Sequence, residues 1–186
     1  SHSSGAGQPL SEDLSRATML ARLNSLMRGY SGIHPSAASV LTALLNERIT
    51  ACIYERGGVG ASGDLVQLAH LALNLIGEGE VLVDGAWRPA KEAMAARNIN
   101  PLEIHLREGL GLMNGTSAMT GVGMVNVIHA RKLINCSIIL SAITNELMKS
   151  FDDHFSFELN HVKHHRGQSK VAEAIRNILS DSKLIR

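Results

Sequence analysis

The feature that most constrains this chain is a glycine-rich stretch at residues 57–64, with the sequence Gly-Gly-Val-Gly-Ala-Ser-Gly-Asp. Glycine adopts backbone angles that other residues rarely reach, and it lets another group approach the chain closely. The apolar segment 65–76 follows at once, with Asp64 placed as a helix N-cap and Gly77 placed to end the helix. We therefore expect a buried helix that begins directly at a loop of unusual backbone freedom.

The composition favours packed helices over a sheet-based fold. The chain has 186 residues, of which 45% are hydrophobic, 19% charged and only 3% aromatic. Its formal net charge of +1 indicates no basic surface of the kind that binds nucleic acid, so we expect no nucleic-acid partner. The length predicts a single domain over residues 1–186, and the absence of a starting methionine suggests that this domain is partial.

The number of cysteines and the length of the apolar runs indicate the cellular compartment. Cys52 and Cys136 are too few for a disulfide framework and suit a reducing compartment, so we expect a cytoplasmic protein. Both cysteines are predicted to be small core residues rather than nucleophiles. We find no apolar run of transmembrane length and no signal peptide, and we therefore expect no membrane partner.

The apolar periodicity predicts a mainly α protein with one small β-hairpin. Helices are predicted over 11–28, from Pro35 through Leu45, and over 91–97, 117–150 and 168–179. The hairpin is predicted over 81–88, and segment 49–54 should be extended. Segment 152–166 is polar and is predicted to be irregular.

Two of these helices carry expectations about burial. The helix over 11–28 should face the core with Leu14, Ala17, Leu20, Ala21 and Met27. The proline-free segment 117–150 should form one long buried helix, bent near Gly121 and Gly123.

One hypothesis for the glycine-rich loop is phosphate binding, because residues 58–63 match the G-x-G-x-x-G pattern of dinucleotide-binding proteins. An extended segment precedes the loop, and Asp84 ends another one about 20 residues further on. Against this, Glu55 and Arg56 separate the expected strand from the first glycine, and Asp64 puts a carboxylate where a pyrophosphate would lie. The rest of the chain reads as helical, which makes nucleotide binding the weaker hypothesis.

A second hypothesis is that the chain modifies its own backbone at Ala61, Ser62 and Gly63. The nitrogen of Gly63 can close a ring on the carbonyl carbon of Ala61, because glycine has no Cβ to obstruct the approach. Loss of water from the ring and from the Ser62 side chain leaves an alkene conjugated with an imidazolone, which is a strong electrophile. The helix N-terminus that follows favours electron density on such a group. Without other support, an ordinary glycine-rich turn explains the same residues.

Several longer motifs stand in order along the chain. They are Gly60-Ala61-Ser62-Gly63-Asp64-Leu65, Leu68-Ala69-His70, Gly77-Glu78-Gly79-Glu80 and Arg107-Glu108-Gly109-Leu110-Gly111-Leu112-Met113-Asn114-Gly115-Thr116. With them the whole chain resembles the aromatic amino acid ammonia-lyases, the family of histidine, phenylalanine and tyrosine ammonia-lyases and related aminomutases. Through Gly57-Gly58-Val59-Gly60 and Asn114-Gly115-Thr116-Ser117 it is most similar to tyrosine ammonia-lyases of the flavobacterial kind.

The resemblance implies a fold and a prosthetic group. The fold would be mainly α, a long-helix bundle of the ammonia-lyase type, like fumarase and aspartase, with a small β-hairpin. Ala61, Ser62 and Gly63 would form 4-methylideneimidazol-5-one (MIO) autocatalytically, with no external cofactor. Asn114 would hold the carbonyl of this group and help bind the substrate, although asparagine before glycine is more often a turn or a cap.

The resemblance also implies residues that contact the substrate. Ser1 and His2 match the pair that sorts substrates in the family, and Leu65 would contact the substrate ring. A neutral His2 could hydrogen-bond an imidazole or a phenol, which an apolar pair could not. Read without the resemblance, His2 is a frayed terminal residue and Leu65 an ordinary core residue.

The implied activity is elimination of ammonia from L-tyrosine to give p-coumarate, by a homotetramer whose active sites draw on several subunits. Histidine ammonia-lyase, converting L-histidine to urocanate, and an MIO-dependent aminomutase are the alternatives within the family. The family's catalytic base and carboxylate-binding arginine lie outside this stretch, and neither Tyr30 nor Tyr54 sits in a matching motif. The alternative from another class is a non-catalytic helical oligomerisation fragment.

A histidine cluster near the end of the chain suggests metal binding as a separate hypothesis. It comprises His154, His161, His164 and His165, with Asp152 or Glu158 as further ligands. Because nothing fixes a third ligand, a solvated polar segment explains these residues better, and we expect no metal site.

Overall fold

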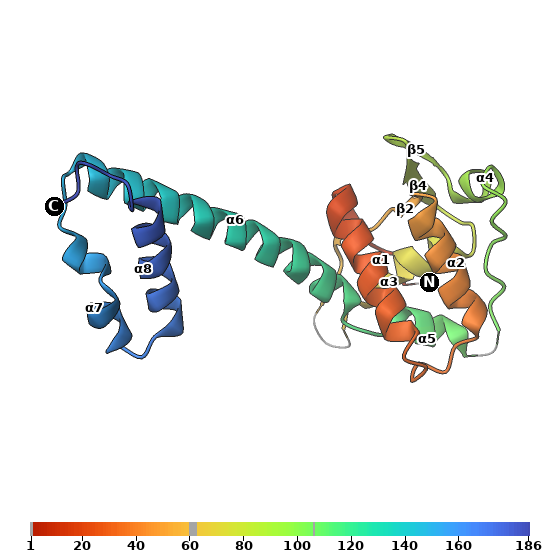
Figure 1. Ribbon diagram of the computed structural model, residues 1–186. Coiled ribbons are helices and arrows are strands. Elements are labelled where there is room, and N and C mark those ends of the chain that lie inside the picture. Colours follow the sequence, from red (N-terminus) through yellow and green to blue (C-terminus); the bar gives the residue numbers. More distant parts are fainter. Residues whose placement is uncertain (1, 60–62, 106) are drawn as a thin grey trace. The chain divides into compact units, whose positions relative to one another are not determined.

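The computed structural model describes residues 2–59, 63–105 and 107–186, and Figure 1 labels their helices and strands. They form two compact units, residues 1–126 and residues 127–186. Helices dominate both units, so the prediction of a mainly α protein is confirmed. The expectation of one domain over residues 1–186 stays a prediction.

The elements agree with most of the predicted ranges to within a few residues. The first unit contains β1 (Ala6–Pro9), α1 (Glu12–Leu26), α2 (Pro35–Asn46), β2 (Thr50–Ala51), β3 (Tyr54–Arg56), α3 (Leu65–Leu75), β4 (Glu80–Val83), β5 (Ala86–Pro89), α4 (Ala90–Ala95) and α5 (Glu108–Met113). Helix α6 (Ser117–Leu147) begins in this unit and continues into the second, which holds the 3₁₀ turn η1 (Asp152–Phe155), α7 (Phe157–His161) and α8 (Arg166–Ile178).

The segment predicted to be irregular, 152–166, instead contains η1 and α7, so that prediction is wrong. The Ser156 hydroxyl accepts a hydrogen bond from the Leu159 N–H and caps the start of α7. Asn160 then donates from its side chain to the carbonyl oxygens of His154 and Ser156, at 3.1 and 2.9 Å. These local bonds, rather than an apolar stripe, shape this part of the chain.

The strands of the first unit form two small antiparallel sheets. Strand β1 pairs with β3, while β2, β4 and β5 make a three-stranded sheet in that order. The predicted hairpin is present, with Asp84 and Gly85 at its turn in left-handed conformations, φ +50° and +78°. Since every described strand pair is antiparallel, the parallel sheet that dinucleotide binding needs is absent from the described residues.

Helix α3 lies at the centre of the first unit's core, as its apolar sequence predicts. Leu68, Leu71 and Leu75 are at most 1% exposed and pack in one cluster with residues of α1, α2, α4 and the three-stranded sheet. Gly77 ends the helix with φ +81°, also as predicted. This buried helix gives the glycine-rich loop a rigid support on one side.

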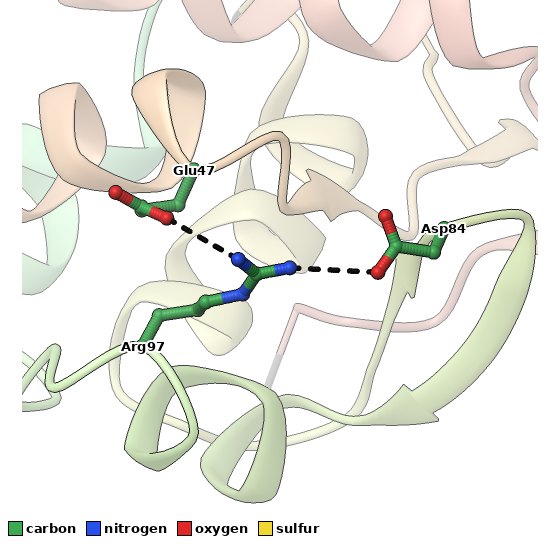
Figure 2. A network of polar contacts seen from close by, with 3 residues as sticks. All are labelled: Glu47, Asp84 and Arg97. Carbon is green, nitrogen blue, oxygen red and sulfur yellow. Dashed lines mark hydrogen bonds and ion pairs between the residues drawn. The ribbon is translucent and has the colours of Figure 1, made fainter.

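A group of ion pairs ties the hairpin to the ends of two helices. Figure 2 shows Arg97, just beyond α4, between Glu47 at the end of α2 and Asp84 at the hairpin turn. The nitrogen-to-oxygen distances are 3.7 Å to Glu47 and 3.4 Å to Asp84. Asp84, which the dinucleotide hypothesis would assign to a ribose, therefore has a structural partner instead.

The buried face of α1 is not the one predicted from the sequence. Its buried residues are Ser15, Thr18, Met19, Arg22, Leu23 and Leu26, whereas Leu20 and Met27 are 54% and 71% exposed. The small side chains let α6 come close, since a Cβ added at Gly121 would lie 2.5 Å from the backbone nitrogen of Thr18. Gly121 thus serves close helix packing, and the bend near Gly121 and Gly123 stays a prediction.

Helix α6 is as long as predicted, but in the described chain it is largely exposed rather than buried. By length and composition alone, the segment Glu108–Leu147 also qualifies as a membrane span, because it contains an 18-residue window with a mean hydropathy of 1.3, of which 6% is buried. The expectation that no apolar run reaches transmembrane length is therefore wrong on those criteria. Arg131 and Lys132 lie in the middle of α6, however, where charges are costly in a lipid core.

Candidate functional site

Asp64 connects the glycine-rich loop to the start of α6. It stands at the N-cap position of α3, but its side chain makes no capping bond there. Instead its Oδ2 accepts a hydrogen bond of 2.8 Å from the Met119 N–H, in the first turn of α6. Its own N–H donates to the Gly115 carbonyl at 2.7 Å. The carboxylate expected to cap α3 therefore caps a helix far along the chain.

Gly63 occupies a position that no other residue fits. Its φ is +88°, and a Cβ added to it would lie 2.4 Å from the carbonyl oxygen of Gly115. A side chain here would meet backbone that cannot move aside cheaply. The absence of a Cβ at Gly63 is also what the predicted ring closure of its nitrogen on a preceding carbonyl needs. Ala61 and Ser62, the other two predicted ring-forming residues, lie outside the described residues.

Asn114 lies at the end of α5, between two surface hollows. One has a volume of about 630 Å³ and lies between α1 and the start of α6; the other, of about 840 Å³, is bordered by 30–32 and 107–111. Asn114 lines both, and its side chain is exposed. Because the next residue, Gly115, contacts Gly63 and Asp64, the structure brings Asn114 and the glycine-rich loop together.

Arg22 of α1 is a buried cation beneath this junction, and sequence reasoning missed it. It is 2% exposed, and its Nη2 donates to the Gly111 carbonyl at 2.5 Å. Burial lowers the pKa of the guanidinium from its usual value. The signal was present in the sequence: Arg22 lies on the stripe with Thr18, Met19 and Leu26, which a correct assignment of the buried face would have shown.

Glu108 is a second buried charge that sequence reasoning did not single out. It is 2% exposed, and its two carboxylate oxygens accept hydrogen bonds from the His105 N–H, at 2.6 Å, and the His34 N–H, at 2.5 Å. These backbone donors lower the pKa of the carboxyl group. Glu108 therefore connects the loop before α2 to the loop before α5. Helix α5 in turn ends just before Asn114.

The segment bearing His2 is anchored to α3 through Gly5. The Gly5 N–H donates to Nε2 of His70 at 3.0 Å, and the His70 ring meets the Tyr54 ring edge-on at 4.9 Å. Burial lowers the pKa of His70, which favours the neutral imidazole that this bond requires. His2 itself is exposed, while Leu65, the first residue of α3, is half-buried. Ser1 lies outside the described residues.

Comparison with known proteins decides the family. The sequence pattern described as "Aromatic amino acid lyase" matches residues 1–186. This chain belongs to the aromatic amino acid lyase family.

Individual relatives in the family carry two kinds of name. Histidine ammonia-lyase of Geobacillus sp. (strain WCH70) is 44% identical over 184 residues, which cover 99% of this chain and 36% of the relative. Tyrosine 2,3-aminomutase of Myxococcus sp. (strain Mx-B0) is 41% identical over 186 residues, covering 100% of this chain and 35% of the relative. This aromatic amino acid lyase chain thus spans about a third of the length of such relatives.

Solved structures confirm the predicted ammonia-lyase fold. The crystal structure of tyrosine aminomutase from Streptomyces globisporus matches with a TM-score of 0.92 at 39% identity, over 100% of this chain and 35% of that one. Histidine ammonia-lyase from Trypanosoma cruzi matches with a TM-score of 0.89 at 30% identity, over 97% of this chain and 36% of that one.

The cysteines and the histidine cluster are the remaining candidate chemistry of this aromatic amino acid lyase chain. Cys52 is buried, which raises the pKa of its thiol and makes it a poor nucleophile; Cys136 is exposed, so the expectation that both are core residues is wrong for it. No set of three potential metal ligands comes together within the described residues. In the histidine cluster, His161 instead stacks on Phe157 with ring centroids 4.8 Å apart.

Proposed function

We propose that the whole protein removes ammonia from L-tyrosine to give p-coumarate, with an electrophilic MIO group formed from Ala61, Ser62 and Gly63. The observation that carries the proposal is the fit at Gly63, where the Gly115 carbonyl leaves no room for a side chain. An ordinary turn does not need such a close approach. Family membership over residues 1–186 supports the same chemistry.

The described residues would act on the substrate and on the group as follows. The MIO group would supply an electrophile for the amine or the ring of the substrate. Asn114, exposed between the two hollows, would donate a hydrogen bond to the carbonyl of the group. Leu65 would contact the substrate ring. The base that removes the β-proton comes from outside residues 1–186, as does the group that binds the substrate carboxylate.

His2 is the residue that would favour a polar aromatic ring. The backbone of its segment is anchored at Gly5 by the bond to His70, and the His2 side chain is exposed and so accessible to a substrate. A neutral imidazole offers both a donor and an acceptor to a phenol. Phenylalanine leaves these groups without a partner, which disfavours it as a substrate.

Histidine, giving urocanate, is the second candidate substrate, because the imidazole of His2 pairs equally well with a substrate imidazole. The 44% identity with a histidine ammonia-lyase favours it. An aminomutase activity, which returns the amine to the neighbouring carbon, is favoured by the 41% identity with a tyrosine 2,3-aminomutase. All three reactions would use the same electrophile.

The exposed apolar surface of α6 supports a homotetramer with shared active sites, and we propose a cytoplasmic one. This surface includes Val127, Ile128, Leu133, Ile134, Ile139, Leu140, Ile143 and Leu147, each at least 45% exposed. Exposed apolar area of this extent marks an interaction surface. With Arg131 and Lys132 on the same helix, we assign its cover to other helices of the assembly rather than to lipid.

Intact-mass measurement of the whole protein tests the prosthetic group. The expected result is a mass lower by two water molecules than the sequence mass, with ultraviolet absorption from a conjugated imidazolone. The Ser62→Ala variant is the control, because it lacks the hydroxyl group that leaves as water. An unmodified mass in the unsubstituted protein would refute the proposal and favour the non-catalytic oligomerisation fragment.

A side-by-side assay with tyrosine, histidine and phenylalanine tests the substrate. We expect arylacrylate formation to be fastest with tyrosine. A clear preference for histidine would replace the first candidate by the second, and β-amino acid formation would indicate the aminomutase. The His2→Phe variant should lose the preference for polar rings over phenylalanine by about tenfold, the effect of losing one hydrogen bond.

A further inference from the structure

Gly115 lies in contact with both the glycine-rich loop and Arg22. Its carbonyl accepts the Asp64 N–H at 2.7 Å and blocks any side chain at Gly63. A Cβ added at Gly115 itself would lie 2.4 Å from Nη1 of Arg22, so the guanidinium lies directly against the Gly115 backbone. Gly63, whose nitrogen would close the predicted ring, therefore lies against Gly115, which in turn lies against Arg22.

Arg22 is an unusual residue to find against Gly115, because its charged guanidinium is buried with incomplete hydrogen bonding. Nη2 donates to the Gly111 carbonyl, but Nε has no hydrogen-bond partner within residues 2–59, 63–105 and 107–186. Burying an incompletely paired cation is unfavourable for stability alone. The planar guanidinium does, however, contact two points at once, Gly111 in α5 and Gly115 just after it, which the ammonium of a lysine cannot do.

We propose that Arg22 is a positioning residue for formation of the prosthetic group. It holds Gly111 and Gly115 so that the Gly115 carbonyl, through its bond from the Asp64 N–H, fixes the backbone on the C-terminal side of Gly63, whose nitrogen makes the attack. This inference rests on the proposed function, because it concerns how the MIO precursor is held rather than how a substrate is bound.

The chemistry that Arg22 supports is balanced within the chain itself. The Gly63 nitrogen bonds to the Ala61 carbonyl carbon, and that carbonyl oxygen leaves as water with the amide hydrogens of Ser62 and Gly63. The second water takes the Ser62 hydroxyl group and its α-hydrogen. No oxidant or co-reactant is needed, so the rate depends on how well the backbone is held near the attack geometry.

The test compares Arg22→Lys with Arg16→Lys in the whole protein. Arg16 is a matched control: it lies on the same helix and donates from Nη2 to a backbone carbonyl, that of Leu45 at 3.0 Å, away from Gly115. The measurement is the rate at which newly folded protein loses two waters, by intact mass, normalised to the folded fraction. We expect Arg22→Lys to slow this loss about tenfold and Arg16→Lys to leave it unchanged.

A second variant keeps the inference testable if Arg22→Lys folds poorly. Gly115→Ala leaves the charge in place but pushes the guanidinium from the turn, and it should slow water loss similarly. Hydrogen exchange at the Asp64 amide, which donates to Gly115, should be faster in both variants.

The possible outcomes separate this inference from the proposed function. Water loss at the unsubstituted rate in folded Arg22→Lys and Gly115→Ala would overturn the role of Arg22 and leave the proposed function standing. Equal slowing in Arg16→Lys would also overturn it, since the effect would then be general destabilisation of α1. Absence of water loss in the unsubstituted protein would overturn the proposed function and this inference together.

Discussion

The two compact units of the chain differ in how far they bury their apolar side chains. Residues 1–126 enclose a continuous core with many side chains at or near zero exposure. In residues 127–186 the buried apolar side chains of the described structure are only Ala142, Ala172 and Ile175, while most of the large ones are exposed. The first unit therefore encloses its own apolar core, whereas the second leaves exposed the kind of apolar surface that commonly marks an interaction site.

The largest expected effect tests this contrast with the same substitution in each unit. Leu41→Ala, at a position with 0% exposure, should cost about 3 kcal/mol of unfolding free energy because it leaves a cavity. Leu140→Ala, at a position with 63% exposure, should change it by less than about 0.5 kcal/mol in the isolated chain. Urea unfolding of both variants measures this. A comparable loss for Leu140→Ala in the isolated chain would contradict the contrast.

The same Leu140→Ala variant sharpens the contrast in the whole protein. If other helices cover α6, the substitution removes buried contacts there and should weaken assembly, as seen by analytical ultracentrifugation at falling concentration. If the substitution leaves assembly unchanged, this part of α6 remains exposed to solvent in the whole protein.

The next largest effect concerns the buried carboxylate of the first unit. Glu108→Gln retains the shape but replaces one acceptor oxygen by a donor, which then faces a backbone N–H of His34 or His105. We expect a loss of about 2 kcal/mol of unfolding free energy at neutral pH. Glu103→Gln, at an exposed carboxylate nearby, is the control and should be neutral.

The Glu108 interaction also predicts a direction of pH dependence. Because the folded-state pKa of Glu108 is lowered, its contribution is fully present above the unfolded-state pKa and is lost as the pH falls through the folded-state pKa. The difference in unfolding free energy between Glu108→Gln and the parent protein should therefore be smaller at low pH than at neutral pH. A constant difference at all pH values would rule out the ionised carboxylate as the cause.

A smaller effect is expected from His70, whose pKa burial lowers below the ordinary value of 6.5. Stability from the Gly5 bond is present above that ordinary value and declines as the pH falls below it, because the unfolded state then binds the proton more readily. Between pH 7.5 and 5.5, His70→Gln should remove about 1 kcal/mol of the pH-dependent change in unfolding free energy. His129→Gln, on an exposed part of α6, is the matched control substitution.

The smallest effect should come from the ion pairs of Figure 2. Arg97, Glu47 and Asp84 are all substantially exposed, so solvent and salt screen their attraction. Arg97→Ala should cost about 0.5 kcal/mol at low ionic strength and less at high salt, measured by urea unfolding at both. A loss that does not respond to salt would point to packing of the arginine stem instead.

Sequence reasoning succeeded where the signals are local. The Gly77 stop and the Asp84-Gly85 turn each follow from residues a few positions apart, and the structure has them in place. It failed where distant residues decide the outcome. Asp64 bonds to a residue 55 positions away, and Arg22 to one 89 positions away, so no local pattern predicts either contact.

The face of α1 shows the same limit in another form. Counting apolar residues put Leu20 and Met27 inside, although both are exposed. The structure instead buries Ser15 and Thr18, because close approach to the glycine of another helix needs small side chains more than apolar ones. Apolar periodicity cannot predict such a contact without knowing the partner helix.

The bonds that Asp64 makes impose an order of events during synthesis. Its partners, Gly115 and Met119, leave the ribosome long after the glycine-rich loop does. Until those residues have been synthesised, Asp64 has neither of these bonding partners. If the proposed ring closure takes place, the geometry that these bonds hold therefore becomes available only after residues 115–119 have been made.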